Sequence, residues 1–147
     1  MRYCLLLVLL LTYTKIADAQ QAAELVFWES PISGRLSQSI VIDTYQDSSG
    51  ALWLATQEGL NRYDGKRVEI YRSNILSDEG IAPGPLIGIK EDARGNVWVA
   101  TRTSIQKFDT ANRAFQTPTP LRSKSEKINA FDIDASGRIW VGSDVGI

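Results

Sequence analysis

Histidine is absent from the 147 residues, and the sequence has a single cysteine, Cys4, and a single methionine. Without histidine, this chain cannot supply a Ser-His-Asp triad, a Cys-His pair or a histidine ligand to a metal. Because Cys4 lies within the first nineteen residues, the rest of the chain has no thiol and forms no disulfide. We therefore predict no metal site, no cofactor and no catalytic residues, so that this segment is not an enzyme.

A strong excess of either charge is also missing. The chain has 16 basic and 17 acidic residues, a net charge of −1, and the charges are scattered along the sequence. No basic patch favours a phosphate backbone, so nucleic acid is not expected as a partner. The carboxylates could in principle provide a pair for glycoside cleavage, but spacing along the chain cannot locate such a pair.

Residues 1–19 have the pattern of a secretory signal peptide. Arg2 gives a positive start, an unbroken apolar run follows at 5–11, and small residues at 17–19 precede Gln20. The apolar run is shorter than the roughly 20 residues that a membrane helix needs. We predict export and removal of this leader, with a retained membrane anchor as the alternative.

One motif occurs three times in the remaining sequence. Its tryptophans are 45 and 42 residues apart, within the range of about 40 to 50 residues that is typical of four-stranded propeller blades. An aspartate stands six residues before each tryptophan, a glycine three residues before it, and a hydroxyl residue three residues after it. The three copies are Asp47, Gly50, Trp53 and Thr56; Asp92, Gly95, Trp98 and Thr101; and Asp134, Gly137, Trp140 and Ser143.

Each unit predicts short antiparallel strands. Asp-x-x-Gly favours a tight reversal, because the aspartate bonds to nearby backbone and the glycine adopts positive φ. The expected strands are 39–46, 51–56, 60–64 and 68–71 in the first unit, 86–91, 96–102, 105–109 and 114–117 in the second, and 138–143 in the third.

The second strand of each unit is apolar on both faces. Leu52 and Leu54 lie on one side and Trp53 on the other, so both faces must be covered. Stacked blades provide that cover, whereas a sandwich leaves the outer face of each sheet polar. Two residues after each tryptophan comes a small residue, Ala55, Ala100 or Gly142, which leaves room for a neighbouring sheet.

The predicted fold is therefore all-β, an incomplete β-propeller of about two and a half blades. Closed propellers have about 4 to 8 blades, so we expect the chain to be an N-terminal fragment whose partners include downstream blades of a longer parent chain. A strand at 26–29 is expected to close the ring in that parent. The predicted parts are signal peptide 1–19, lead-in 20–38, blade one 39–72, blade two 85–117 and partial blade three 128–147.

The run from Asp47 to Gly65, Asp-Ser-Ser-Gly-Ala-Leu-Trp-Leu-Ala-Thr-Gln-Glu-Gly-Leu-Asn-Arg-Tyr-Asp-Gly, closely resembles the two-component regulator propeller repeat. The resemblance extends over nearly all of residues 25–147. It implies the periplasmic sensing region of a bacterial receptor, followed by a connector, a membrane span and a histidine kinase or diguanylate cyclase. It also implies an inner-membrane anchor through a missing downstream segment and a receptor that could be a homodimer.

The second unit departs from the repeat at two places. Ser104 replaces the glycine found at Gly59, and Gln106-Lys107 replaces Asn61-Arg62. We interpret the Asn-Arg pair as a blade-packing feature.

Any ligand of such a propeller should meet the loops opposite the Asp-x-x-Gly turns, because polar loop residues on a rigid scaffold commonly carry recognition. We expect an oligosaccharide or another small ligand there; a merely solvated rim is the alternative. A secreted polysaccharide-degrading enzyme or binding protein, and a purely structural interaction module, remain alternative functions. The predicted ligand-binding residues are Gln38, Gln57, Glu58, Arg102 and Asp144.

The repeated aspartates and tryptophans receive structural roles in this interpretation. The aspartates lack the alternating oxygen ligands of a calcium loop, so we predict that they cap turns. The tryptophans lie on inner strands and are predicted to pack in the core, although aromatic rings can also stack on sugars. Trp28 stands outside the repeat.

Overall fold

The computed structural model describes residues 26–73, 80–117 and 126–146. The predicted signal peptide, Cys4 and the beginning of the lead-in lie outside these residues. The chain divides into two compact units, Met1–Ser30 and Pro31–Ile147. In the described part of the chain, no helix is long and apolar enough to cross a bilayer.

Of the first unit, residues 26–30 are described, and they form no regular secondary structure. No strand among the described residues pairs with 26–29. Trp28 is 86% exposed and not part of a core. Ring closure by this segment in a longer protein stays a prediction.

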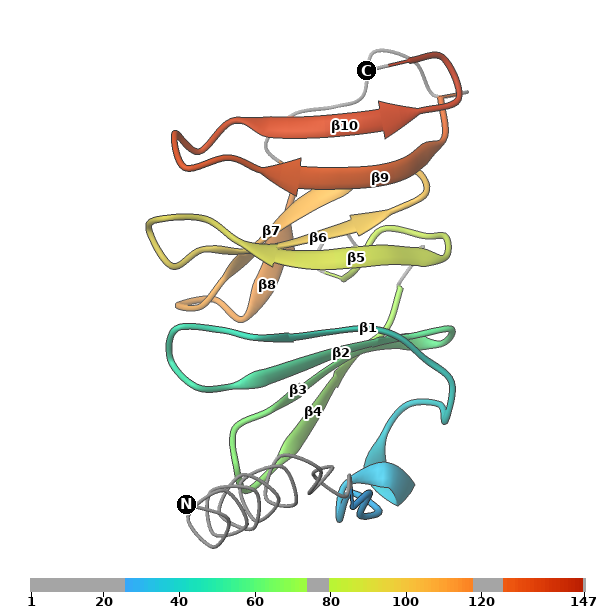
Figure 1. Ribbon diagram of the computed structural model, residues 1–147, viewed down its shortest axis with the longest axis vertical. Helices are drawn as coiled ribbons and strands as arrows, with labels where there is room; N and C mark the ends of the chain where they lie inside the picture. The colour runs from blue at the N-terminus through green and yellow to red at the C-terminus, as the bar shows by residue number, and fades with distance from the viewer. Residues whose placement is uncertain (1–25, 74–79, 118–125, 147) are drawn as a thin grey trace, which may run out of the picture. The chain divides into compact units, whose positions relative to one another are not determined.

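The second unit consists of antiparallel sheets, which confirms the predicted all-β, propeller-blade fold (Figure 1). A short 3-10 helix, η2 (Ser33–Arg35), precedes the first sheet. Blade one is β1 (Val41–Gln46), β2 (Leu52–Thr56), β3 (Gly59–Tyr63) and β4 (Val68–Tyr71); blade two is β5 (Leu86–Glu91), β6 (Val97–Thr101), β7 (Ile105–Asp109) and β8 (Ala114–Gln116); β9 (Ile128–Ile133) and β10 (Ile139–Ser143) form a third sheet. The predicted strand ends differ from these by at most two residues.

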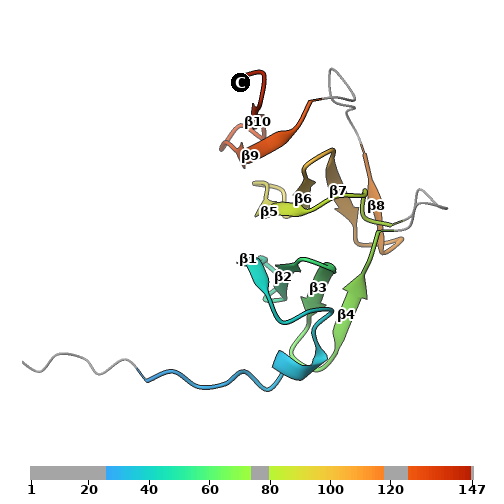
Figure 2. The same ribbon diagram turned by 90° about the vertical axis from the view of Figure 1, so that its right-hand side faces the viewer.

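The first strand of every sheet has a β-bulge at the same place. The pairing register shifts so that Ile42, Ile87 and Asn129 have no partner on the second strand. Each of the three residues stands eleven positions before the tryptophan of its unit. A bulge bends a strand and redirects its side chains, so this repeated kink shapes the inner strands β1, β5 and β9, which follow one another in space (Figure 2).

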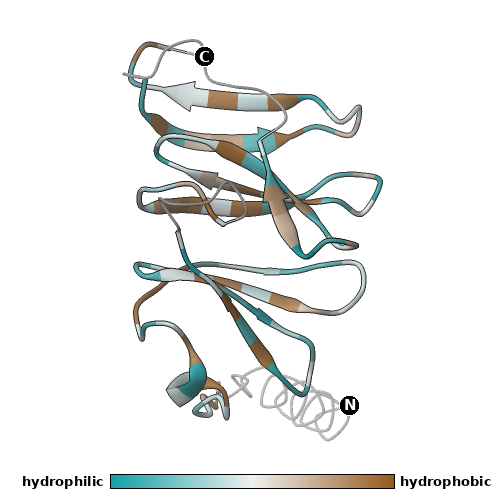
Figure 3. Cartoon of the chain, turned by 180° about the vertical axis from the view of Figure 1, so that it is seen from behind, coloured by the Kyte–Doolittle hydropathy of each residue, from teal (hydrophilic) through white to brown (hydrophobic). Residues whose placement is uncertain are grey.

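Buried apolar side chains form two clusters that join neighbouring sheets, and Figure 3 marks the hydrophobic positions along the strands. Between blades one and two, Trp53 is 1% exposed and meets Phe108 edge-on, with ring centroids 4.9 Å apart. Trp98 packs against the cluster between blade two and the third sheet. Trp140, in contrast, is 50% exposed, so the predicted core role applies only in part to this ring.

Each repeated aspartate accepts hydrogen bonds from its own turn and from the tryptophan. In the first copy, Asp47 Oδ1 accepts the backbone N–H groups of Ser49 and Ala51, and Oδ2 accepts the indole N–H of Trp53 at 2.7 Å. The same indole bond measures 2.9 Å from Trp98 to Asp92 and 3.1 Å from Trp140 to Asp134. The aspartate therefore has two roles: it caps the turn, and it accepts the hydrogen bond of the indole N–H.

These hydrogen bonds keep the aspartates ionised. Burial alone would raise the pKa of Asp92, but the bonds from Trp98 and Asn96 outweigh it and lower the pKa to about 2. In Asp134, the backbone and side chain of Arg138 bring the pKa to about 2. The carboxylates of Asp47, Asp92 and Asp134 are thus hydrogen-bonded within their own turns.

Candidate ligand-binding face

The strand register places two sets of loops at one end of the sheets. The start of each first strand pairs with the end of the second strand, as in Val41 with Thr56 and Leu86 with Thr101. The turns that follow the second strands therefore lie beside the segments that lead into the first strands. We call this end the loop face. It is formed by residues 37–40, 57–58, 80–85, 102–104, 126–129 and 144–146. All five predicted ligand-binding residues lie on it.

The repeated hydroxyl residue closes the turn after each second strand. Thr56 Oγ1 donates to the carbonyl of Gly59 at 2.8 Å, and Ser143 Oγ donates to the carbonyl of Gly146 at 3.0 Å. In blade two, Thr101 Oγ1 accepts the backbone N–H of Ser104 at 3.1 Å. Ser104 therefore keeps the same turn although it replaces a glycine.

Arg102 connects blade two to the third sheet. Its backbone N–H donates to the carbonyl of Pro85 at 3.0 Å, and its carbonyl accepts the N–H of Ile128 at 3.0 Å. The exposed guanidinium donates from Nη2 to Oδ1 of Asn129 at 2.9 Å, and Asn129 is the bulged residue of β9. Both the backbone and the side chain of Arg102 are thus fixed across the boundary between two sheets.

Asp144 holds the other side of the same segment. Its N–H donates to the carbonyl of Lys127 at 3.1 Å, and its Oδ1 accepts the N–H of Lys127 at 2.9 Å. The structure therefore places Arg102 and Asp144 on either side of residues 127–129. The segment is thus flanked by a guanidinium and a carboxylate and carries the amide of Asn129, groups which together donate and accept hydrogen bonds.

The three predicted residues of blade one do not join this group. Gln38 is half-buried, and its Oε1 accepts the N–H of Ile40. Gln57 and Glu58 are exposed, and the backbone N–H of Glu58 donates to Thr56. The hydrogen bonds of Gln38 and Glu58 remain within blade one.

The Asn61-Arg62 pair, interpreted from the sequence as a blade-packing feature, makes two separate sets of contacts. Asn61 is fully buried and bonds within blade one, to Leu54 and to Ser37 of the loop face. Arg62 lies over the Trp53 ring, 5.6 Å from its centroid. The two side chains alternate to opposite faces of β3, so they have separate partners.

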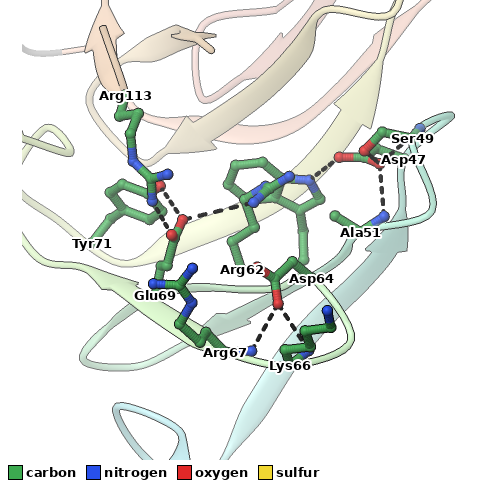
Figure 4. A network of polar contacts seen from close by, with 11 residues as sticks. Asp47, Ser49, Ala51, Arg62, Asp64, Lys66, Arg67, Glu69, Tyr71 and Arg113 are labelled. Carbon is green, nitrogen blue, oxygen red and sulfur yellow. Dashed lines mark hydrogen bonds and ion pairs between the residues drawn. The ribbon is translucent and has the colours of Figure 1, made fainter. Parts of the chain in front are cut away.

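A polar cluster at the outer strands joins blades one and two (Figure 4). Glu69 of β4 pairs with Arg113, from the turn before β8, and with Arg62 at 3.7 Å. The hydrogen bond from Arg113 lowers the pKa of Glu69. Burial and the nearby Glu69 carboxylate raise the pKa of Tyr71 to about 12. Because Glu69 of blade one is paired with Arg113 of blade two, the cluster links the two blades.

Sequence reasoning did not include Lys127 or Asn129 among the ligand-binding residues, and it did not predict that Asn61 and Gln106 hold the segments before β1 and β5. Asn61 and Gln106 carried a signal that could have identified them, since each stands eight residues after the tryptophan of its blade. Among the described residues, no group of three or more acidic, histidine or cysteine side chains could hold a metal ion.

The chain is similar to a histidine kinase in part of its sequence and to extracellular domains of two component systems in its fold. No family model matches the sequence. A histidine kinase named P4 from Formosa agariphila is 46% identical over 68 residues, which are 46% of this chain and 5% of the kinase.

Solved structures with the same fold come from B. thetaiotaomicron. The extracellular domain attributed to the hybrid two component system BT3049 superposes with a TM-score of 0.60 and 25% identity, over 72% of this chain and 16% of that one. The extracellular domain of BT4673, attributed to a one component or hybrid two component system, has a TM-score of 0.57 and 23% identity, over 80% of this chain and 18% of that one. The chain thus spans less than a fifth of each of these relatives.

Proposed function

We propose that this chain is part of an extracytoplasmic, ligand-sensing β-propeller of a bacterial two-component or diguanylate cyclase receptor. The observation that supports this most strongly is the likeness to the extracellular domain of BT3049 over 72% of the chain. The 46% identity to a histidine kinase adds support from the sequence. Signalling chemistry would belong to other parts of such a receptor, and this segment would bind rather than catalyse.

The loop face is the proposed ligand-binding surface. Around residues 127–129, Arg102 supplies donors, Asp144 supplies acceptors and Asn129 supplies both. A ligand rich in hydroxyl groups both donates and accepts hydrogen bonds, so an oligosaccharide fits this mixture better than a simple anion does. Because Arg102 is fixed to two sheets at once, a ligand bound to it contacts two neighbouring blades.

Titration calorimetry with a panel of plant and algal oligosaccharides tests the proposal on the full chain. We expect at least one member to bind, and Arg102→Ala to weaken its affinity about ten-fold or more, the loss expected for a charge-assisted hydrogen bond. Arg94→Ala is the matched control, because it removes an exposed arginine from the opposite, Asp-turn end. Its affinity should stay within about two-fold of the unaltered chain.

Two results would contradict the proposal. One is an affinity that Arg102→Ala and Asp144→Asn leave unchanged, which would remove the loop face as the site. The other is the absence of binding to any panel member together with a full coding sequence that contains neither a membrane span nor a kinase or cyclase.

A further inference from the structure

Two buried carboxamides occupy the same position in successive blades. Asn61 in β3 is 0% exposed and Gln106 in β7 is 4% exposed, and each stands eight residues after the tryptophan of its blade. A polar side chain at such depth destabilises the fold unless its hydrogen bonds are made. The hydrogen-bond partners of Asn61 and Gln106 therefore indicate the structural role of each amide.

In blade one, the carboxamide binds the segment that leads into β1. Asn61 Oδ1 accepts the backbone N–H of Ser37 at 2.7 Å, and Nδ2 donates to Oγ of the same serine at 2.9 Å. Nδ2 also donates to the carbonyl of Leu54 on β2 at 3.2 Å. Ser37 Oγ is 2.8 Å from Thr56 Oγ1, so the lead-in segment is also tied to the turn that follows β2.

In blade two, the longer carboxamide binds the equivalent segment in a different way. Gln106 Oε1 accepts the backbone N–H of Ala82 at 2.6 Å, and Nε2 donates to the carbonyl of Gly80 at 3.3 Å. Ser37 and Ala82 are equivalent, since each stands sixteen residues before the tryptophan of its blade. Ala82 has no hydroxyl group to accept the second bond, and the extra methylene of glutamine lets the amide reach a backbone carbonyl instead.

We infer that Asn61 and Gln106 are positioning residues for the loop face, each matched in length to the residue it holds: asparagine with serine, and glutamine with alanine. Each of the two amides holds a backbone segment that leads directly to residues of the loop face. Gln38 follows Ser37 directly, and the segment after Ala82 provides the Pro85 carbonyl to which Arg102 bonds. The inference rests on the proposed function in one respect only, namely that the loop face binds a ligand.

The matched pairs allow a test by exchange between blades. Gln106→Asn shortens the side chain, so the Ala82 amide should lose its acceptor and exchange with deuterium about ten-fold faster. Adding Ala82→Ser rebuilds the pair of blade one and should restore exchange to within about two-fold. In blade one, Ser37→Ala removes the hydroxyl, and Ser37→Ala with Asn61→Gln rebuilds the pair of blade two. Single-residue exchange by NMR, with amides of β3 and β7 as internal controls, measures all four proteins.

Faster exchange confined to the Ala82 or Ser37 segment, and its rescue by the paired change, support the inference. Equal acceleration throughout β7, or a failure of rescue in both blades, overturns it, because a merely structural amide would affect the whole sheet. If Gln106→Asn does not fold, blade one provides the test, in which Ser37→Ala removes the bond from Asn61 Nδ2 while Oδ1 still accepts the amide of residue 37. These measurements need no ligand, so normal rescue without binding to any oligosaccharide would count against the proposed function alone.

Discussion

Replacing Asp47 by Asn tests whether the aspartate and tryptophan of the repeat work as one unit. The asparagine oxygen can still accept the turn amides of Ser49 and Ala51, but its NH2 group stands where Oδ2 now accepts the indole N–H at 2.7 Å. Two donors then face each other. The indole N–H of Trp53, whose side chain is 1% exposed, is left without a partner.

The magnitude follows from the burial of that donor. An unsatisfied buried group costs about 1–3 kcal/mol, and a hydrogen bond to a charged acceptor contributes about 1.5–3 kcal/mol. We expect Asp47→Asn to lower the free energy of unfolding by about 2–3 kcal/mol. Trp53→Phe removes the donor itself, together with part of the packing. Because both changes remove the same bond, the double variant should recover about 1–2 kcal/mol relative to the sum of the single variants.

The other two copies of the repeat provide internal controls. The Trp140 ring is 50% exposed, so water can replace the lost acceptor when Asp134 is changed to Asn. We expect the loss of stability to decrease from Asp47→Asn through Asp92→Asn to Asp134→Asn. Urea unfolding followed by circular dichroism avoids any dependence on tryptophan fluorescence. Equal losses at all three sites, or a coupling energy below about 0.3 kcal/mol between Asp47 and Trp53, would show that the two residues do not act together.

Two further predictions concern packing and pH. Gly88→Ala should lower the free energy of unfolding by about 1–2 kcal/mol, because a Cβ atom would lie 3.2 Å from Asp43 Oδ2 and 3.4 Å from Phe131. Gly142→Ala is the control: its neighbours lie at 3.8 Å, so it should be neutral or slightly stabilising in the same urea assay. Equal effects of the two substitutions would contradict this reasoning. The pKa of Asp92 is about 2 in the folded chain against 3.8 for the free residue, so its contribution to stability is complete above pH 3.8 and is lost as the pH falls toward about 2. Unfolding midpoints measured in this window should fall less steeply in Asp92→Asn, and an unchanged slope would contradict the assignment.

The strands could be predicted because the same pattern of apolar and turn residues occurs in all three copies of the repeat. Leu52, Trp53 and Leu54 place apolar groups on both faces of one strand, which requires a sheet on either side. The Asp-x-x-Gly turns fix where each strand ends, since Gly50 adopts φ +86 and Asp47 caps the turn. The β-bulge could not be predicted in this way. It depends on a shift in pairing between two strands, which leaves no mark on the alternation of either one.

The loop face could be predicted as a location but not as an arrangement. The register of the hairpins puts Gln57, Arg102 and Asp144 at one end, because the turns recur at the same distance from each tryptophan. Which of them meet depends on how one sheet sits against the next. Arg102 bonds to Asn129, the bulged residue of β9, which lies outside the pairing of β9 with β10.

Hydrogen bonds within a blade recur from one blade to the next, whereas the side-chain contacts between neighbouring blades differ. In all three copies the aspartate accepts the indole N–H of the tryptophan, and the turn hydroxyl donates to the carbonyl three residues further on. Glu91, in contrast, accepts the N–H and hydroxyl of Ser48 across the first boundary, and the equivalent position in β9 is Ile133, which packs in the apolar cluster. A bridging contact has to suit one particular pair of sheets, so nothing holds it constant along the chain.

Side chains on the loop face also differ from blade to blade. The position of Arg102 is occupied by Gln57 in blade one and by Asp144 in the third sheet, so a cation, an amide and an anion stand at equivalent places. Their backbones are held in the same kind of turn by Thr56, Thr101 and Ser143. The scaffold therefore presents chemically different groups at a fixed spacing. A ligand that spans two blades would be recognised by the order of these groups, and exchanging the side chains at 57 and 102 should alter which oligosaccharide binds while leaving the blades intact.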